Sequence, residues 1–91
     1  MYEIFATNKF KRDIKKCKRQ NKSIPKLQTI LELLTAGEAL PASNRDHNLT
    51  GNYASHRECH IEPDWLLIYR INEEEKLIEL VRTGSHSELF S

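Results

Sequence analysis

The sequence predicts an α+β domain in which two antiparallel N-terminal helices pack on one face of a mainly antiparallel sheet of four to five strands, in the order β-α-α-β-β-β. Apolar residues recur with a helical period in the first part of the chain, and the pattern changes to that of strands after residue 52. Helices packed on one face of such a sheet are typical of this class. The 91 residues show no repeat or linker, so one domain is expected over residues 1–91.

The N-terminal segment predicts a short strand and a helix. Residues 2–6 (YEIFA) form the strand, and Thr7 or Asn8 can cap the helix that follows. This helix has a narrow apolar stripe and a broad basic face. The stripe consists of Phe10, Ile14 and Cys17. The helix is expected to end near residues 20–22.

A second helix follows after a short link, so the two helices are expected to form an antiparallel hairpin. Ser23 can cap this helix, and Pro25 is tolerated in the first turn because the amide there has no helical partner. Gly37 is a natural C-terminal cap. The apolar stripe consists of Leu27, Ile30, Leu31 and Leu34.

The rest of the chain predicts a loop and three strands. Residues 38–52 (EALPASNRDHNLTGN) show no period, and long loops in compact domains are often functional. Alternate residues then separate in YASHRECHIE, with Cys59 and Ile61 on one face and His56, Glu58, His60 and Glu62 on the other. The remaining elements are a turn (63–64), a central strand that is apolar on both faces (65–71), a charged turn (72–75) and a last strand (76–83).

Charge is unevenly distributed along the chain. Residues 1–28 hold nine basic and two acidic residues (+7), whereas residues 29–91 hold five basic and eleven acidic residues (−6). A long basic run that is almost unopposed favours nucleic-acid binding over a merely solvated helix surface. The residues of the first helix expected to contact RNA are Lys9, Lys11, Arg12, Lys15, Lys16, Lys18 and Arg19.

The composition argues against a membrane or secreted protein. No apolar run approaches the ~20 residues of a membrane span, and the start lacks the order of a signal peptide. Cys17 and Cys59 have no CxxC spacing, which indicates reduced thiols rather than a disulfide framework. The protein is therefore expected to be cytoplasmic and to have no membrane partner.

Three of the four histidines stand at positions that suit catalysis. His47 lies in the long loop, His60 on the polar face of its strand, and His86 after the last strand. If successive strands lie side by side, His60 and His86 converge with Asp64 and Arg82 on one cleft. His47 joins them if the loop folds over the cleft. Asp64 is the only acidic residue that this reasoning places there.

A metal site is the weaker interpretation. His56 and His60 have the spacing of a helical ligand pair, but on a strand they stand roughly 13 Å apart by rise, too far for one ion. Cys59 points to the opposite face. No metal and no other cofactor are expected, and His56 is taken as a surface residue without a role.

Imidazoles, a carboxylate and an arginine suit RNA cleavage without a metal. A base removes the proton of a ribose 2′-OH, which attacks the neighbouring phosphate, and an acid protonates the departing 5′-oxygen. Histidine suits both proton transfers because its pKa lies near neutral pH, and arginine can grip two phosphate oxygens. Aromatic side chains such as Trp65 and Phe90 can stack on bases. The same groups could also serve other phosphodiesters.

Three strings, DHNLTG, RECHIEPDWLLIY and LVRTGSHSELF, resemble the hallmark segments of the YafQ toxins, within the RelE/ParE superfamily. Their order and spacing match over nearly the whole chain. The resemblance implies an mRNA interferase, which is the ribonuclease of a type II toxin–antitoxin pair and cuts messenger RNA in the ribosomal A site. It implies three partners: the ribosome with its rRNA, the mRNA, and a cognate antitoxin of the ribbon-helix-helix type, similar to DinJ.

The resemblance also implies roles for residues that match the family's segments. The active-site set is His47, His60, Asp64, Arg82, His86 and Phe90, with Trp65 as a neighbouring RNA contact. His86 is expected to be the general acid and Asp64 the general base, a role that His60 could also take. His47 and His60 would stabilise the transition state or relay protons, and Arg82 would hold the phosphate.

Two other functions remain open. A ParE-like toxin would use this fold to inhibit DNA gyrase without cutting anything, and an inactive module would only bind RNA or the ribosome. The acid–base set favours the nuclease, because a pure inhibitor needs no such groups.

Overall fold

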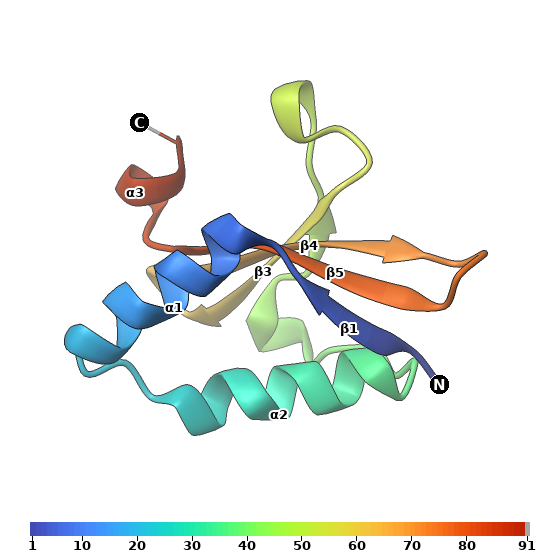
Figure 1. Ribbon diagram of the computed structural model, residues 1–91, viewed down its shortest axis with the longest axis horizontal. Helices are drawn as coiled ribbons and strands as arrows, with labels where there is room; N and C mark the ends of the chain where they lie inside the picture. Colours follow the sequence, from blue (N-terminus) through green and yellow to red (C-terminus); the bar gives the residue numbers. More distant parts are fainter. Residues whose placement is uncertain (91) are drawn as a thin grey trace.

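The computed structural model describes residues 1–90 and consists of a five-stranded sheet with α1 and α2 on one face and α3 beyond the other (Figure 1). Residue 91 of the predicted domain lies outside that range. The strands are β1 (Glu3–Ala6), β2 (His47–Asn48), β3 (Arg57–Glu62), β4 (Trp65–Asn72) and β5 (Leu77–Gly84). The helices are α1 (Asn8–Arg19), α2 (Ile24–Thr35) and α3 (His86–Phe90), with 3₁₀ turns η1 (Ala42–Asn44) and η2 (Gly51–Tyr53). The predicted α+β class and the order of the main elements are confirmed.

The sheet has the order β1-β5-β4-β3-β2 and is mixed. β1 pairs with β5 in parallel, and all other neighbours are antiparallel. The chain therefore returns through the helical hairpin before it adds its last three long strands. The sequence did not predict β2, because a strand of two residues is too short to show a period.

Local signals account for the ends of the long helices. Thr7 caps α1, and its hydroxyl accepts the N–H of Phe10 at 3.0 Å. Ser23 takes the same position in α2 but makes no capping hydrogen bond with its side chain. Gly37 follows the last turn of α2 with φ +73°, a conformation that glycine adopts without a steric penalty.

The main core lies between α1, α2 and the sheet. The apolar stripes of both helices face it, as predicted, and the buried side chains of α1 and α2 are Phe10, Cys17, Leu27, Ile30 and Leu34. Both cysteines are buried and unpaired; burial raises the pKa of the Cys17 thiol and raises that of Cys59 to about 12.

A second, smaller apolar cluster lies on the other face of the sheet. Leu66 and Ile68 of β4 are fully buried there under Leu89 of α3, with Leu49 and Tyr53 of the long loop against them. β4 is therefore covered on both faces, as its continuous apolar run predicted. In Figure 1 the loop before β3 and α3 both stand on this side, away from α2. Among residues 1–90, no helix has the length and apolar character that crossing a membrane requires.

Candidate active site

Three imidazole rings lie in a row on the sheet face opposite the main core. The ring centroids of His47 and His60 are 6.5 Å apart, and those of His60 and His86 are 6.0 Å apart. The ring of Phe90 continues the row at 5.7 Å from His86. The structure therefore brings together side chains from β2, β3 and α3, and the long loop folds back to deliver His47.

Arg57 binds the side chains of both neighbours of His47. Its Nη2 donates to Asp46 Oδ2 at 2.8 Å, and its Nη1 donates to Asn48 Oδ1 at 2.6 Å. The Tyr69 hydroxyl donates a short hydrogen bond to the same Asp46 carboxylate. The hydrogen bond to Asp46 raises the pKa of Arg57, and burial is the main cause of the raised pKa of Tyr69. Since neighbouring residues of a strand point to opposite faces, this clamp directs His47 toward the histidine row.

Glu58 lies between two of the histidines and is almost fully buried, with 3% of its surface exposed. Its Oε1 is 3.5 Å from Nε2 of His47 and 3.5 Å from Nε2 of His60. The expectation that Asp64 is the only acidic residue of the cleft is therefore wrong. Strand alternation had placed Glu58 on the same face as His60, but its burial depends on the loop that folds over it.

His86 occupies the first turn of α3, which begins with a capping box. Ser85 Oγ accepts the N–H of Glu88 at 3.2 Å, and Glu88 Oε1 accepts the N–H of Ser85 at 2.8 Å. Asp64, from the β3–β4 turn, accepts the backbone N–H of His86 at 3.1 Å and lies 3.9 Å from its Nδ1. The carboxylate of Asp64 therefore anchors the helix end that carries His86, while 72% of its side chain stays exposed.

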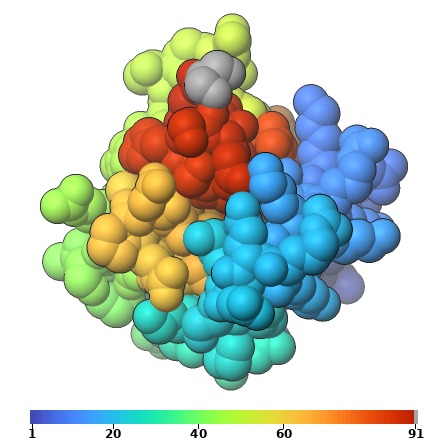
Figure 2. Space-filling model, turned by 90° about the vertical axis from the view of Figure 1, so that its left-hand side faces the viewer, coloured from blue at the N-terminus to red at the C-terminus, as the bar shows by residue number. Residues whose placement is uncertain are grey.

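Glu88 also ties α3 to the basic helix. Its Oε2 pairs with Lys16 Nζ at 2.7 Å and accepts a hydrogen bond from Gln20 at 3.3 Å. The bond to Lys16, followed by the backbone N–H of Ser85, lowers the pKa of Glu88 to about 2. Figure 2 shows the resulting contact, with the red surface of α3 between the gold β3–β4 region and the blue surface of α1 and the link that follows it.

Arg82 is held by α1 rather than left free. Its Nε and Nη2 donate to the two oxygens of Asp13 at 2.7 and 3.1 Å, and the same carboxylate accepts the N–H of Thr83 at 3.1 Å. The hydrogen bond to Asp13 is the main cause of the raised pKa of Arg82, and Tyr53 also contributes. Asp13 is the one acidic residue of α1. Because it points inward, the outer face of the helix carries only positive charge.

Trp65 lies in the core and not in the site. The side chain is 0% exposed, and its Nε1 donates to Thr83 Oγ1 at 2.9 Å. Lys22 covers the ring, with its Nζ 5.8 Å from the ring centroid. The prediction that Trp65 contacts RNA is therefore wrong, because no base can reach its ring.

Tyr53 is a further residue of the site that the sequence did not reveal. Its ring meets Phe90 and His56 edge-on, at centroid distances of 5.9 and 5.7 Å. Tyr53 and Phe90 line a hollow of about 580 Å³ beside the histidine row, with Thr50 and Asn52 at its rim. His56, taken as a surface residue, is half-buried and supports Tyr53. A lone aromatic in an irregular loop gives no period from which this contact could have been inferred.

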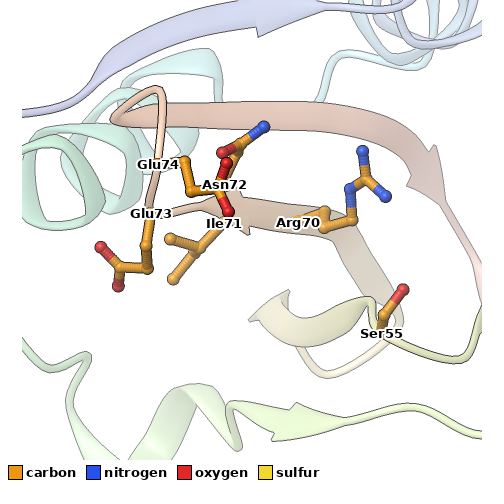
Figure 3. Close-up of a pocket in the computed structure, with 6 residues that line it drawn as sticks. All are labelled: Ser55, Arg70, Ile71, Asn72, Glu73 and Glu74. Carbon is orange, nitrogen blue, oxygen red and sulfur yellow. The ribbon is translucent and has the colours of Figure 1, made fainter.

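Other hollows occur on the surface of the protein. One of about 380 Å³ lies on the other side of His60, between Asn44, Arg45 and Pro63. Figure 3 shows a second, open hollow at the far end of β4, lined by Ser55, Arg70, Ile71, Asn72, Glu73 and Glu74. Its arginine is already paired with Glu79 at 2.7 Å. None of the candidate site residues lines this hollow, so it is not part of the site.

Known proteins resemble this chain over almost its whole length. The mRNA interferase toxin YafQ of Escherichia coli (strain K12) is 36% identical over 89 residues, which cover 97% of this chain and 95% of the relative. The crystal structure of a metal-bound toxin from Helicobacter pylori is 38% identical, with a TM-score of 0.94 over 99% of this chain and all of that one. YafQ in the E. coli DinJ–YafQ toxin–antitoxin complex is 35% identical, with a TM-score of 0.88 over 99% and 98% of the two chains.

The family model for the bacterial toxin of type II toxin–antitoxin systems, YafQ, matches residues 2–91. Sequence identity, fold and the spacing of the three segments thus agree with the resemblance that the sequence showed. The chain belongs to the YafQ family of type II toxin–antitoxin toxins.

Proposed function

We propose that this chain is the toxin of a type II toxin–antitoxin pair and an endoribonuclease that cleaves mRNA on the ribosome. The observation that carries the proposal is the row of His47, His60 and His86, with Asp64 beside it, next to an outward-facing basic helix. Its relatives from E. coli are named mRNA interferases, which agrees with the chemistry of these groups. The cognate antitoxin is expected to resemble DinJ, the partner of the E. coli relative.

The proposed reaction gives each of these groups a role. Asp64 takes the proton of the ribose 2′-OH, a role that His60 could fill, and the oxygen attacks the adjacent phosphorus. His86 then protonates the departing 5′-oxygen. His47, His60 and the remaining N–H groups of Arg82 stabilise the charge on the phosphorane. Phe90 and Tyr53 offer ring faces and edges to splayed bases of the mRNA.

We expect this reaction to need no added metal ion. A two-metal nuclease needs several carboxylates around a pair of ions. The two acidic side chains of the row are already engaged, Glu58 with two imidazoles and Asp64 with the amide of His86. Within residues 1–90, no three His, Cys, Asp or Glu side chains are placed to hold one ion. The relative from H. pylori is described as metal-bound, so the test below varies the metal.

Cleavage through the 2′-OH predicts the ends of both fragments. On ribosomes programmed with message, the upstream fragment should carry a 2′,3′-cyclic phosphate or a 3′-phosphate, and the downstream fragment a free 5′-OH. Replacing the scissile 2′-OH with hydrogen should abolish cleavage, because the nucleophile is gone. Mass spectrometry of the fragments gives both results.

The magnesium concentration is held constant in this test because ribosomes need magnesium for their own integrity. Added zinc or manganese, or a zinc-selective chelator, should then leave the rate unchanged. A downstream 5′-phosphate, or cutting of the deoxy substrate, would refute the mechanism. Intact mRNA together with inhibited DNA gyrase would instead support the ParE-like alternative.

The basic helix is expected to dock on ribosomal RNA. Changing Lys11, Lys15 and Lys18 to Glu should weaken co-sedimentation with ribosomes and flatten its salt dependence, by about 0.9 in the logarithmic slope per lost phosphate contact. All three side chains are exposed. The matched control changes Lys26 and Lys76, which lie on α2 and beside the β4–β5 turn, to Glu. Equal binding by the triple variant and the wild type across the salt series would count against this role.

A further inference from the structure

Glu58 is a buried carboxylate whose charge must be balanced from within the site. Only 4% of its side chain is exposed, and moving an ionised carboxylate out of water is costly unless it is paired. Its charged partners among residues 1–90 are His47 and His60; no lysine or arginine pairs with it there. The neighbouring Arg57 points to the other face and forms an ion pair with Asp46. Among the described side chains, the two imidazoles are the groups placed to supply a balancing positive charge.

The orientation of both rings shows where a proton can sit. Nδ1 of His47 is 2.7 Å from the carbonyl oxygen of Arg45, and Nδ1 of His60 is 3.2 Å from that of Pro63. A carbonyl oxygen only accepts, so each Nδ1 must carry the hydrogen. In a neutral ring the bare lone pair of Nε2 would then face the carboxylate at 3.5 Å, which is repulsive. A proton on one Nε2 turns that repulsion into an ion pair.

We propose that Glu58 is a positioning residue that holds an extra proton on the His47–His60 pair, so that one ring is an imidazolium when the substrate arrives. The carboxylate aims both Nε2 atoms at one point and keeps positive charge beside the place where the phosphorane forms. This inference deepens the proposed ribonuclease function and rests on it for its consequence in catalysis. The protonation state itself belongs to the free protein and can be tested without substrate.

The other groups around Glu58 do not supply this charge. Across the sheet, the β4 residue that pairs with Glu58 is Ile68, and the one that pairs with His60 is Leu66, both apolar. From α3, His86 approaches His60 at 6.0 Å but is placed by Asp64, which lies 3.9 Å from its Nδ1. On the β3 side, Cys59 faces the opposite core. His47 and His60 are therefore the groups whose protonation responds to Glu58.

The direct test is ¹H–¹⁵N long-range NMR of the imidazole rings in the free toxin near neutral pH. In the wild type, one of His47 and His60 should show both nitrogens protonated, and both should keep a protonated Nδ1. In Glu58→Gln, both rings should show only Nδ1 protonated at the same pH. Two singly protonated rings in the wild type, or identical ring spectra in wild type and variant, would overturn the proposal. The wild-type measurement decides even where the variant does not fold.

The consequence for catalysis is measured on programmed ribosomes. Glu58→Gln should lower kcat about 10–100-fold with little change in KM, the size seen when a carboxylate that orients a metal-bound imidazole is removed. As the pH rises, the activity of this variant should fall at a lower pH than that of the wild type, because the imidazolium loses its proton at a lower pH. Glu58→Asp, which keeps the charge, should recover part of the rate. Wild-type kcat and pH profile in Glu58→Gln would refute the positioning role.

The matched control is Glu62→Gln, which lies on the same strand but beyond the irregularity in pairing that follows His60. Its carboxylate is paired with Lys26 at 2.9 Å, away from the histidines. This variant should leave the ring spectra, kcat and pH profile as in the wild type. An inactive wild type with the predicted ring spectra would refute the ribonuclease function and leave the protonation inference standing. An active wild type in which both rings are neutral would support the ribonuclease function and refute the protonation inference.

Discussion

Replacing His86 with alanine is expected to lower the rate of mRNA cleavage by about 10²–10⁴-fold, the usual cost of removing a general acid or base. The fold should survive, because the contacts that hold α3 do not use the imidazole. The backbone N–H of His86 binds Asp64, and the capping box between Ser85 and Glu88 is independent of it. Single-turnover cleavage on programmed ribosomes measures the loss, and thermal unfolding checks the fold.

His56→Ala is the matched control for His86→Ala. This histidine lies outside the row, with its ring against Tyr53 and its Nδ1 3.1 Å from the carbonyl oxygen of Ala54. Its loss should change the cleavage rate by less than tenfold, an order below the smallest effect expected for the general acid. A folded His86→Ala toxin that still cleaves at the wild-type rate would exclude His86 as the acid. Growth arrest by a folded variant that no longer cleaves would favour gyrase inhibition.

The long elements could be predicted from the sequence because each repeats its pattern several times. The stripes of α1 and α2 follow from helical periods, and the two-sided burial of β4 follows from a continuous apolar run. β2 and α3 have two and five residues, too few for a period. A local signal for α3 was nevertheless present, since SHSE, residues 85–88, has the S-x-x-E form of a capping box.

The site depended on contacts between residues far apart in the chain. Strand alternation put Glu58 and His60 on one face. The position of His47 depends on Arg57, which binds the side chains of Asp46 and Asn48 from 11 and 9 residues away. Asp13 approaches Arg82 across 69 residues. No spacing in the sequence reports such pairs, so the sequence did not reveal that Asp13 orients Arg82.

The prediction that Trp65 contacts RNA was wrong because it rested on the neighbouring residue Asp64 and not on the apolar run to which Trp65 belongs. It is the first residue of β4, whose next four residues are all buried. Since side chains alternate along a strand, Trp65 shares a face with Leu67 and Tyr69, which belong to the main core. The burial of Trp65 therefore follows from its place in this apolar strand, whereas the resemblance implied an RNA contact.

Trp65→Ala is accordingly expected to reduce the free energy of unfolding by about 3–5 kcal/mol, the usual cost of a large aromatic cavity. The ring is fully buried, and its loss also leaves Thr83 without the indole donor. Trp65→Phe keeps most of the volume and should cost about 1–3 kcal/mol, because the hydrogen bond to Thr83 is lost. Urea denaturation in the His86→Ala background, which is expected to be inactive and so not toxic during expression, measures both values.

Phe5→Ala on β1 is the matched control for this loss. Phe5 is 55% exposed, so its replacement should change stability by less than about 0.5 kcal/mol.

Trp65 is the single tryptophan of the chain, so its fluorescence reports its own surroundings. Its emission should be typical of a buried indole and should stay unchanged when RNA is added to the folded toxin. Quenching by RNA would show that a base reaches the ring, and it would restore the stacking role that the buried position excludes.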